Sequence, residues 1–316
     1  MKRKSIIIGV KGKNLSKYEI QLLRSIKPWG IILFERNIFG INQLRKLTEQ
    51  IKKCFNDDNF PILIDQEGGR VSRLNAIFNF THYSQKYFGE RYVKNNNKFF
   101  EKYYANYINF LCGLLNFLGI NINISPVLDV REGSLNSIIG DRSFSNNQFV
   151  VNKLGKLCIK LHHNNKIGTV IKHVPGHGSS EIDSHFSLPI IKISRSELLK
   201  RDFFPFVNSK SFFAMTAHVK FVNFDSKNPA THSKIIINDI VRKKMNFNGL
   251  IMTDDISMNA LKFDLKKNVI KALDAGCNLI LHCNGNYFEA KKISKIVPFC
   301  DEFVSHKTKQ FYKLLN

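Results

Sequence analysis

The chain has 316 residues, of which 43% are hydrophobic, so it can bury a sizeable core and does not have the composition of a disordered protein. Its 48 Lys and Arg residues against 25 Asp and Glu residues give a net charge of +23, which attracts anions. The six cysteines form no C-x-x-C pair, which argues against a zinc site or a disulfide framework. Neither a signal peptide nor an apolar run of membrane-spanning length is evident, so we expect a cytoplasmic protein with no membrane contact.

The basic residues are spread along the whole chain and are not gathered in one patch. The longest clusters, residues 2–4 and 242–244, are not interleaved with aromatic side chains. The composition is also rich in Lys, Asn, Ile and Phe, as an AT-biased genome would produce. We therefore expect no specific nucleic-acid partner. The alternative from a different functional class is a basic, catalytically inactive module that binds nucleic acid or an anionic membrane.

Eight short and nearly continuous apolar runs predict strands that are buried on both faces of a parallel sheet. They are residues 5–10, 30–34, 61–65, 121–127, 168–172, 212–216, 249–253 and 278–282. The segments between them show helical spacing of apolar residues: 15–26, 44–54, 100–118, 149–163, 196–208, 235–245 and 269–275. Ser194 stands three residues before Glu197, a spacing typical of a helix start. The longest predicted loop region is 70–97, with aromatics that we expect to be exposed.

Eight such repeats in a chain of this length predict an α/β fold, a closed (β/α)₈ TIM barrel, with residues 1–316 forming a single domain. The alternative is an open, doubly wound sheet. Functional residues of a barrel lie at the carboxyl ends of its strands. Ionisable residues follow nearly every predicted strand here: Glu35, Asp65, Glu67, Asp129, Lys172, His173, His218, Asp254, Asp255 and His282. The pattern therefore predicts an enzyme with its pocket at those ends.

The stretch 172–189, K-H-V-P-G-H-G-S-S-E-I-D-S-H-F-S-L-P, has the composition of an active-site loop. A predicted strand ends in Lys172 and His173 and opens into a Gly-rich segment that carries Asp183-x-His185. Its glycines and serines would let this loop move over a substrate. The alternative is a polar surface loop that happens to contain three histidines.

Several motifs together resemble glycoside hydrolase family 3, in its branch of single-domain bacterial β-N-acetylglucosaminidases. They are I-D-Q-E-G-G-R-V-S-R-L at 64–74, S-P-V-L-D-V at 125–130, G-D-R-S-F at 140–144, the K-H-V-P-G-H-G and D-S-H segments of 172–185, P-A-T-H-S at 229–233 and L-I-M-T-D-D-I-S-M at 250–258. The resemblance implies a TIM barrel without a metal or cofactor. It also implies retaining hydrolysis of a terminal, non-reducing β-linked N-acetylglucosamine. The substrates it implies are muropeptides carrying 1,6-anhydro-N-acetylmuramic acid, in peptidoglycan recycling.

The resemblance also implies roles for individual residues. Asp254 matches the catalytic nucleophile, and Asp183 with His185 matches an acid/base dyad. A histidine suits this task because it titrates near neutral pH and a nearby carboxylate favours its protonated form. Neighbouring strand residues point in opposite directions, so we expect Asp255 to face away and to act as a carboxylate at a helix start. A phosphorylase is a close variant, since a histidine acid/base tolerates an anionic acceptor.

Five further residues match the family's pocket around the sugar ring: Asp65, Arg73, Arg142, Lys172 and His173. The alternative for Arg142 is an ion pair with Asp129 or Asp141. We expect Glu67 and Arg70 to form a structural pair outside the site. His177, His218 and His282 are expected to pack at the top of the barrel or to support site residues. The expected partner is an oligosaccharide substrate, and we expect a monomer.

Overall fold

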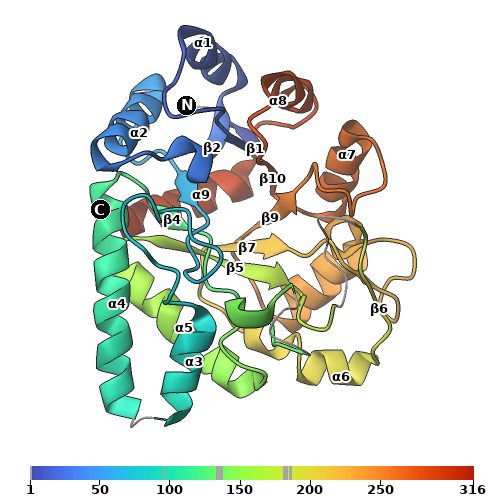
Figure 1. The fold of residues 1–316 in the computed structure, drawn as a ribbon. Coiled ribbons are helices and arrows are strands. Elements are labelled where there is room, and N and C mark those ends of the chain that lie inside the picture. Colours follow the sequence, from blue (N-terminus) through green and yellow to red (C-terminus); the bar gives the residue numbers. More distant parts are fainter. Residues whose placement is uncertain (1, 95–96, 133–137, 181–183, 185–186) are drawn as a thin grey trace.

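Eight parallel strands close into a barrel in the computed structural model, which describes residues 2–94, 97–132, 138–180, 184 and 187–316 (Figure 1). Around the barrel the strands follow the order β1, β10, β9, β7, β5, β4, β3, β2. Their bounds are β1 Lys4–Gly9, β2 Pro28–Leu33, β3 Ile62–Ile64, β4 Ile122–Asn123, β5 Gly168–Val174, β7 Phe213–Thr216, β9 Leu250–Asp255 and β10 Leu279–His282. Each predicted apolar run overlaps one of these strands. The closed barrel confirms the predicted fold and excludes the open sheet.

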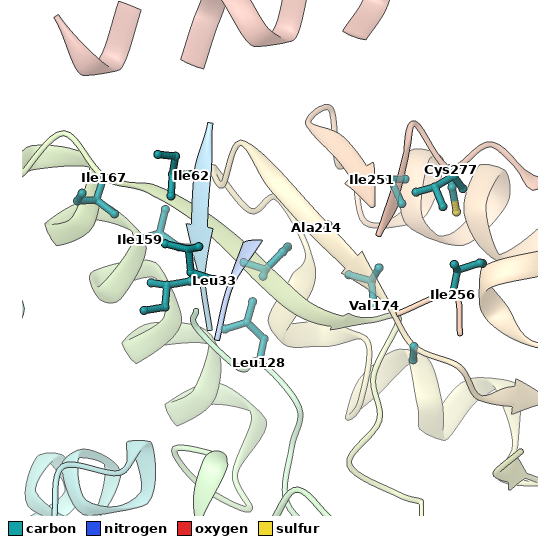
Figure 2. Close-up of a cluster of buried hydrophobic side chains, with 14 of the residues drawn as sticks. Leu33, Ile62, Leu128, Ile159, Ile167, Val174, Ala214, Ile251, Ile256 and Cys277 are labelled. Atoms are coloured by element: carbon teal, nitrogen blue, oxygen red, sulfur yellow. The ribbon is translucent and has the colours of Figure 1, made fainter. Parts of the chain in front are cut away.

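The strands carry apolar side chains on both faces, which explains why their sequences show runs and not alternation. Ile7, Ile32 and Leu63 point into the barrel and form one buried cluster. Their neighbours, such as Ile6 and Leu33, join a second cluster between the sheet and the surrounding helices. Figure 2 shows part of this outer cluster: Leu33, Ile62, Leu128, Ile159, Ile167, Val174, Ala214, Ile251, Ile256 and Cys277.

The helices alternate with the strands along the chain and cover the outside of the barrel (Figure 1). The α-helices are α1 Lys17–Ile26, α2 Ile41–Phe55, α3 Gln85–Lys94, α4 Asn97–Phe117, α5 Gln148–Asn164, α6 Arg195–Lys200, α7 Leu265–Ala275, α8 Tyr287–Ser294 and α9 Glu302–Leu315. Four short 3₁₀ helices are described: η1 Glu35–Asn37, η2 Gly140–Arg142, η3 Phe204–Phe206 and η4 Ala230–His232. The element η5, Ile235–Lys244, is a π-helix. The predicted cap is confirmed, because the Ser194 side chain accepts the backbone N–H of Glu197.

Some elements differ from the prediction. Helix α3 lies inside the region expected to be a long loop, and the aromatics Phe80 and Phe88 of that region are buried. The predicted helix 196–208 ends early as α6 and continues as the short turn η3. Strands β6 Ile190–Ile191 and β8 Lys220–Phe221 form a small separate parallel sheet that the sequence did not predict.

Helix α9 packs across the amino-terminal end of the barrel and places side chains in the inner cluster. Phe311 is fully buried in the inner cluster, with its ring 5.3 Å from that of Phe213. Trp29 of β2 donates its indole N–H to Thr308 of the same helix at 2.8 Å. The amino-terminal end of the barrel is therefore filled by side chains from α9. In the part of the chain that the structure describes, no helix has the length and apolar character needed to cross a membrane.

Candidate active site

A cavity of about 240 Å³ lies at the carboxyl ends of the barrel strands. Apolar side chains such as Ile32, Met215 and Leu281 contribute to its wall, between charged side chains from other strands. Six of the eight predicted site residues line this cavity: Asp65, Arg73, Arg142, Lys172, His173 and Asp254. The other two, Asp183 and His185, lie outside the described residues.

Asp65, directly after β3, is joined to two of the predicted sugar-binding cations. Its Oδ1 lies 2.5 Å from Nζ of Lys172, and its Oδ2 accepts from Nη2 of Arg73 at 3.2 Å. Lys172 is nearly fully buried, whereas Asp65 keeps some exposure toward the cavity. A carboxylate has about four lone-pair positions. Asp65 can therefore accept ligand hydroxyl groups while it holds both cations.

Glu67 is the main departure from the predicted site. The expected pair with Arg70 is wrong, because Glu67 accepts from Nε and Nη2 of Arg142, each at 2.8 Å. Its Oε1 also lies 2.5 Å from Nζ of Lys172. Arg70 pairs with Asp141 at 3.0 Å, so the alternative pairing of Arg142 with Asp141 is wrong as well. Although burial opposes its charge, Arg142 and Lys172 hold the pKa of the Glu67 carboxyl well below its usual range.

Asp129 is a fully buried carboxylate that organises the start of the 172–189 segment. Its Oδ2 lies 2.8 Å from Nδ1 of His173, and its Oδ1 accepts the backbone N–H of His177 at 2.7 Å. The alternative pairing of Arg142 with this carboxylate is wrong. Burial acts to raise the pKa of Asp129, but His173 and His177 lower it overall. Because Nδ1 makes this contact, the other ring nitrogen of His173 points toward Arg142: Nε2 lies 3.5 Å from Nη2 of Arg142.

Asp254, near the end of β9, brings an ionised carboxylate to the cavity. Its Oδ1 accepts the backbone N–H of Asp255 at 2.8 Å. Burial acts to raise the pKa of Asp254, but His218, His173, that N–H group and Lys172 lower it overall. The carboxylate is therefore charged at neutral pH, as a nucleophile must be.

Asp255 also lines the cavity, so the expectation that only Asp254 would face it is wrong. The oxygens of Asp255 are used in structural hydrogen bonds, from the backbone N–H and the hydroxyl of Ser257 and from the backbone N–H of Cys283. No helix starts here, because α7 begins only at Leu265. Asp255 thus fixes the turn after β9 and ties it to the end of β10.

The described first half of the 172–189 segment packs tightly into the molecule. Residues 174–180 are buried or nearly so, and the Ser179 hydroxyl donates to Asp202 at 2.5 Å. A Cβ atom on Gly178 would lie 1.7 Å from the carbonyl oxygen of Val130. We expected this glycine to allow loop movement. The structure shows a different role for it, because its backbone lies so close to the backbone of Val130 that no side chain fits.

His177, His218 and His282 lie around the site, as expected. His218 bridges the hydroxyl of Thr231, at 2.7 Å, and the carbonyl oxygen of Asp255, at 3.0 Å. His282 lies 2.9 Å from a carboxylate oxygen of Glu289. His177 lines the cavity, and burial lowers its pKa to about 4, so it is neutral at pH 7. Within the described ranges, no group of three or more His, Cys, Asp or Glu side chains is arranged to hold a metal ion.

The sequence as a whole matches a known family. The profile of the glycosyl hydrolase family 3 N terminal domain matches residues 8–306. The chain belongs to this family. Its relatives include the β-hexosaminidase of Haemophilus influenzae, 34% identical over 288 residues that cover 89% of this chain and 79% of the relative. That of Hydrogenovibrio crunogenus is 31% identical over 285 residues, covering 88% and 78%.

Solved structures with the same fold also include β-hexosaminidase-type enzymes. NagZ from Neisseria gonorrhoeae in complex with N-trifluoroacetyl-D-glucosamine superposes with a TM-score of 0.88 and 28% identity, over 98% of this chain and 90% of that one. The native NagZ structure gives a TM-score of 0.89 with 29% identity. These relatives confirm the prediction of a family 3 glycoside hydrolase of the β-hexosaminidase kind.

Proposed function

We propose that the chain is a retaining exo-β-N-acetylglucosaminidase that removes terminal, non-reducing N-acetylglucosamine from muropeptides. The muropeptides carry 1,6-anhydro-N-acetylmuramic acid as the leaving group, as in peptidoglycan recycling. The observation that carries the proposal is the ionised Asp254 carboxylate in a cavity that also contains Asp65, Lys172 and Arg142. The β-hexosaminidase relatives support it, as does the N-acetylglucosamine analogue bound to the gonococcal NagZ.

In the proposed reaction Asp254 attacks the anomeric carbon of the sugar. The bond from that carbon to the leaving oxygen breaks, and a covalent glycosyl-aspartate forms. His185, held by Asp183, donates a proton to the leaving oxygen. Water then attacks the same carbon, gives its proton to His185 and releases the carboxylate of Asp254. Two inversions at one carbon give net retention of configuration.

The remaining polar side chains of the cavity would bind the sugar hydroxyl groups. Asp65 would accept hydrogen bonds, while Lys172, Arg73, Arg142 and His173 would donate or share them. The cavity of about 240 Å³ is smaller than the roughly 300–1,000 Å³ of drug-sized ligand sites, which favours a single terminal sugar ring. The proposal includes residues 1–316 acting as one catalytic domain, as a monomer in the cytoplasm, without a cofactor or a nucleic-acid partner.

The decisive experiment measures turnover of a purified anhydro-muropeptide against a chitin disaccharide. We expect the muropeptide to have the higher kcat/KM, and we expect ¹H NMR to show the β-anomer of N-acetylglucosamine as the first product. A first product with inverted configuration would contradict the Asp254 mechanism. Release of a sugar 1-phosphate when inorganic phosphate is added would instead identify a phosphorylase.

A further inference from the structure

Glu67 has a contact pattern that the proposed function does not use. Its side chain is only 1% exposed, and it is absent from the cavity wall, whereas Asp65 from the same segment lines that wall. Both partners of Glu67 do line the cavity: Arg142 from η2 and Lys172 from β5. The carboxylate therefore lies behind the wall and touches the two cations from the side away from a ligand.

One oxygen of Glu67 is shared between the two cations. Oε1 lies 2.8 Å from Nη2 of Arg142 and 2.5 Å from Nζ of Lys172, while Oε2 accepts Nε of Arg142 at 2.8 Å. Two cations this close repel each other, and the attraction of both to a negatively charged oxygen between them offsets that repulsion. Glu67 therefore allows Arg142 and Lys172 to converge on one small cavity.

The same carboxylate sets the charge of this part of the wall. Arg142 and Lys172 without Glu67 and Asp65 would form a pair of bare cations, which is the kind of site that binds phosphate or sulfate. Glu67 and Asp65 offset the charges of Arg142 and Lys172. Arg73, which also pairs with Asp65, and Asp254 add one further charge of each sign to the wall. The remaining N–H groups can then donate to uncharged hydroxyl groups without also attracting anions.

We propose that Glu67 is a positioning residue that orients Arg142 and Lys172 for a neutral sugar and prevents the cavity from binding anions. This inference rests on the proposed function for the identity of the sugar. It explains why a buried carboxylate stands in this position although burial of an unpaired charge is costly.

The test compares Glu67→Gln with the wild-type enzyme. Glutamine keeps the shape of the side chain but removes the charge, and it leaves one acceptor oxygen where the carboxylate has two. We expect kcat/KM for 4-nitrophenyl β-N-acetylglucosaminide to fall by about 10- to 100-fold, since displaced binding groups have effects of this size. We also expect inorganic phosphate to bind at least about tenfold more tightly, measured by calorimetry and as competitive inhibition. A role in folding alone would not create affinity for phosphate.

Two further variants keep the test decisive. Asp141→Asn removes a carboxylate that pairs with Arg70 nearby, so it should leave kcat/KM and phosphate affinity within about threefold of wild type. Glu67→Asp keeps the charge but is too short to hold both cations. It should lose part of kcat/KM without gaining phosphate affinity, and it serves if the glutamine variant does not fold.

The proposal is overturned if Glu67→Gln has wild-type kcat/KM and wild-type phosphate affinity. It is also overturned if Asp141→Asn gives the same two changes as Glu67→Gln. If the wild-type enzyme hydrolyses no hexosaminide, the proposed function fails, but phosphate calorimetry still decides the role of Glu67.

Discussion

Nδ1 of His173 lies 2.8 Å from Oδ2 of Asp129, and the other oxygen of that carboxylate accepts the backbone N–H of His177. A single buried side chain thus holds the strand end that carries Lys172 and His173 together with the segment that follows. The contact also assigns the N–H of His173 to Nδ1, which leaves Nε2 to face Arg142 and the cavity.

Replacing Asp129 by Asn should therefore weaken both the site and the fold. The amide cannot accept at both positions with a full negative charge, so His173 loses its fixed orientation. We expect kcat/KM to fall by about 10- to 100-fold and the free energy of unfolding to fall by roughly 2–4 kcal/mol. Glu132→Gln is the control, because the Glu132 side chain is half exposed in its pair with Arg201 and its replacement should change stability by less than about 1 kcal/mol. Wild-type kcat/KM in Asp129→Asn would disprove this role.

Replacing each of the two adjacent aspartates of β9 should have a different effect: one on activity, the other on stability. Asp254→Asn removes the proposed nucleophile, and we expect kcat to fall by at least about 10⁴-fold with an unchanged melting temperature. Asp255→Ala removes the hydrogen bonds from Ser257 and Cys283, so it should lower the melting temperature and reduce kcat far less. Kinetics and thermal unfolding of both variants provide the check. Activity of Asp254→Asn within about tenfold of wild type would refute the nucleophile assignment.

Buried histidines should make the fold sensitive to mild acid. Burial lowers the pKa of His162 from 6.5 to about 4. Between these values the unfolded chain binds a proton that the folded chain does not. This contribution to stability is therefore complete above pH 6.5 and is lost as the pH falls toward 4, by up to about 1.4 kcal/mol per pH unit. His163, His177 and His232, with pKa values lowered to about 4, act in the same direction.

Urea unfolding at pH 7, 6 and 5 measures this effect. In His162→Gln the decline in the free energy of unfolding between pH 6.5 and 5 should be shallower by about one proton. The matching control is His306→Gln on the surface of α9, which should leave the slope unchanged. Equal slopes in all three proteins would rule out His162 as a source of the acid sensitivity.

A methyl group at Gly178 should displace the segment that leads toward Asp183 and His185. The added Cβ would lie 1.7 Å from the carbonyl oxygen of Val130, so backbone must move. We expect Gly178→Ala to lower the free energy of unfolding by roughly 2–4 kcal/mol and kcat/KM by at least about tenfold. Gly113→Ala in α4 meets no atom within 4 Å and should be neutral or stabilising by up to about 1 kcal/mol. The two melting temperatures and kcat/KM values test this contrast.

The barrel was predictable because its strands are buried on both sides. Each strand therefore stands out as an apolar run, and polar residues at its carboxyl end, such as Asp65 and Asp254, reach one cavity. Helix α3 was missed because it buries few residues, namely Gln85, Phe88 and Gly89, and so gives a weak periodic signal. Phe88 packs against Tyr104 of the neighbouring helix α4.

The partners of Glu67 could not be predicted from local sequence. Arg70 stands three residues away and is the partner that the local sequence suggests, but the positive φ of Gly68 and Gly69 turns the backbone between them. The actual partners, Arg142 and Lys172, approach only when β3, β4 and β5 lie side by side. Such ion pairs form only when the barrel closes, so a short stretch of sequence does not reveal them.

The packing of α9 across the amino-terminal end of the barrel means that a helix which follows all eight strands closes this end. Phe311 of α9 buries its ring against Phe213. Without α9, Trp29 and Phe213 would face water. Residues on the side of the barrel opposite the pocket therefore keep its interior dry.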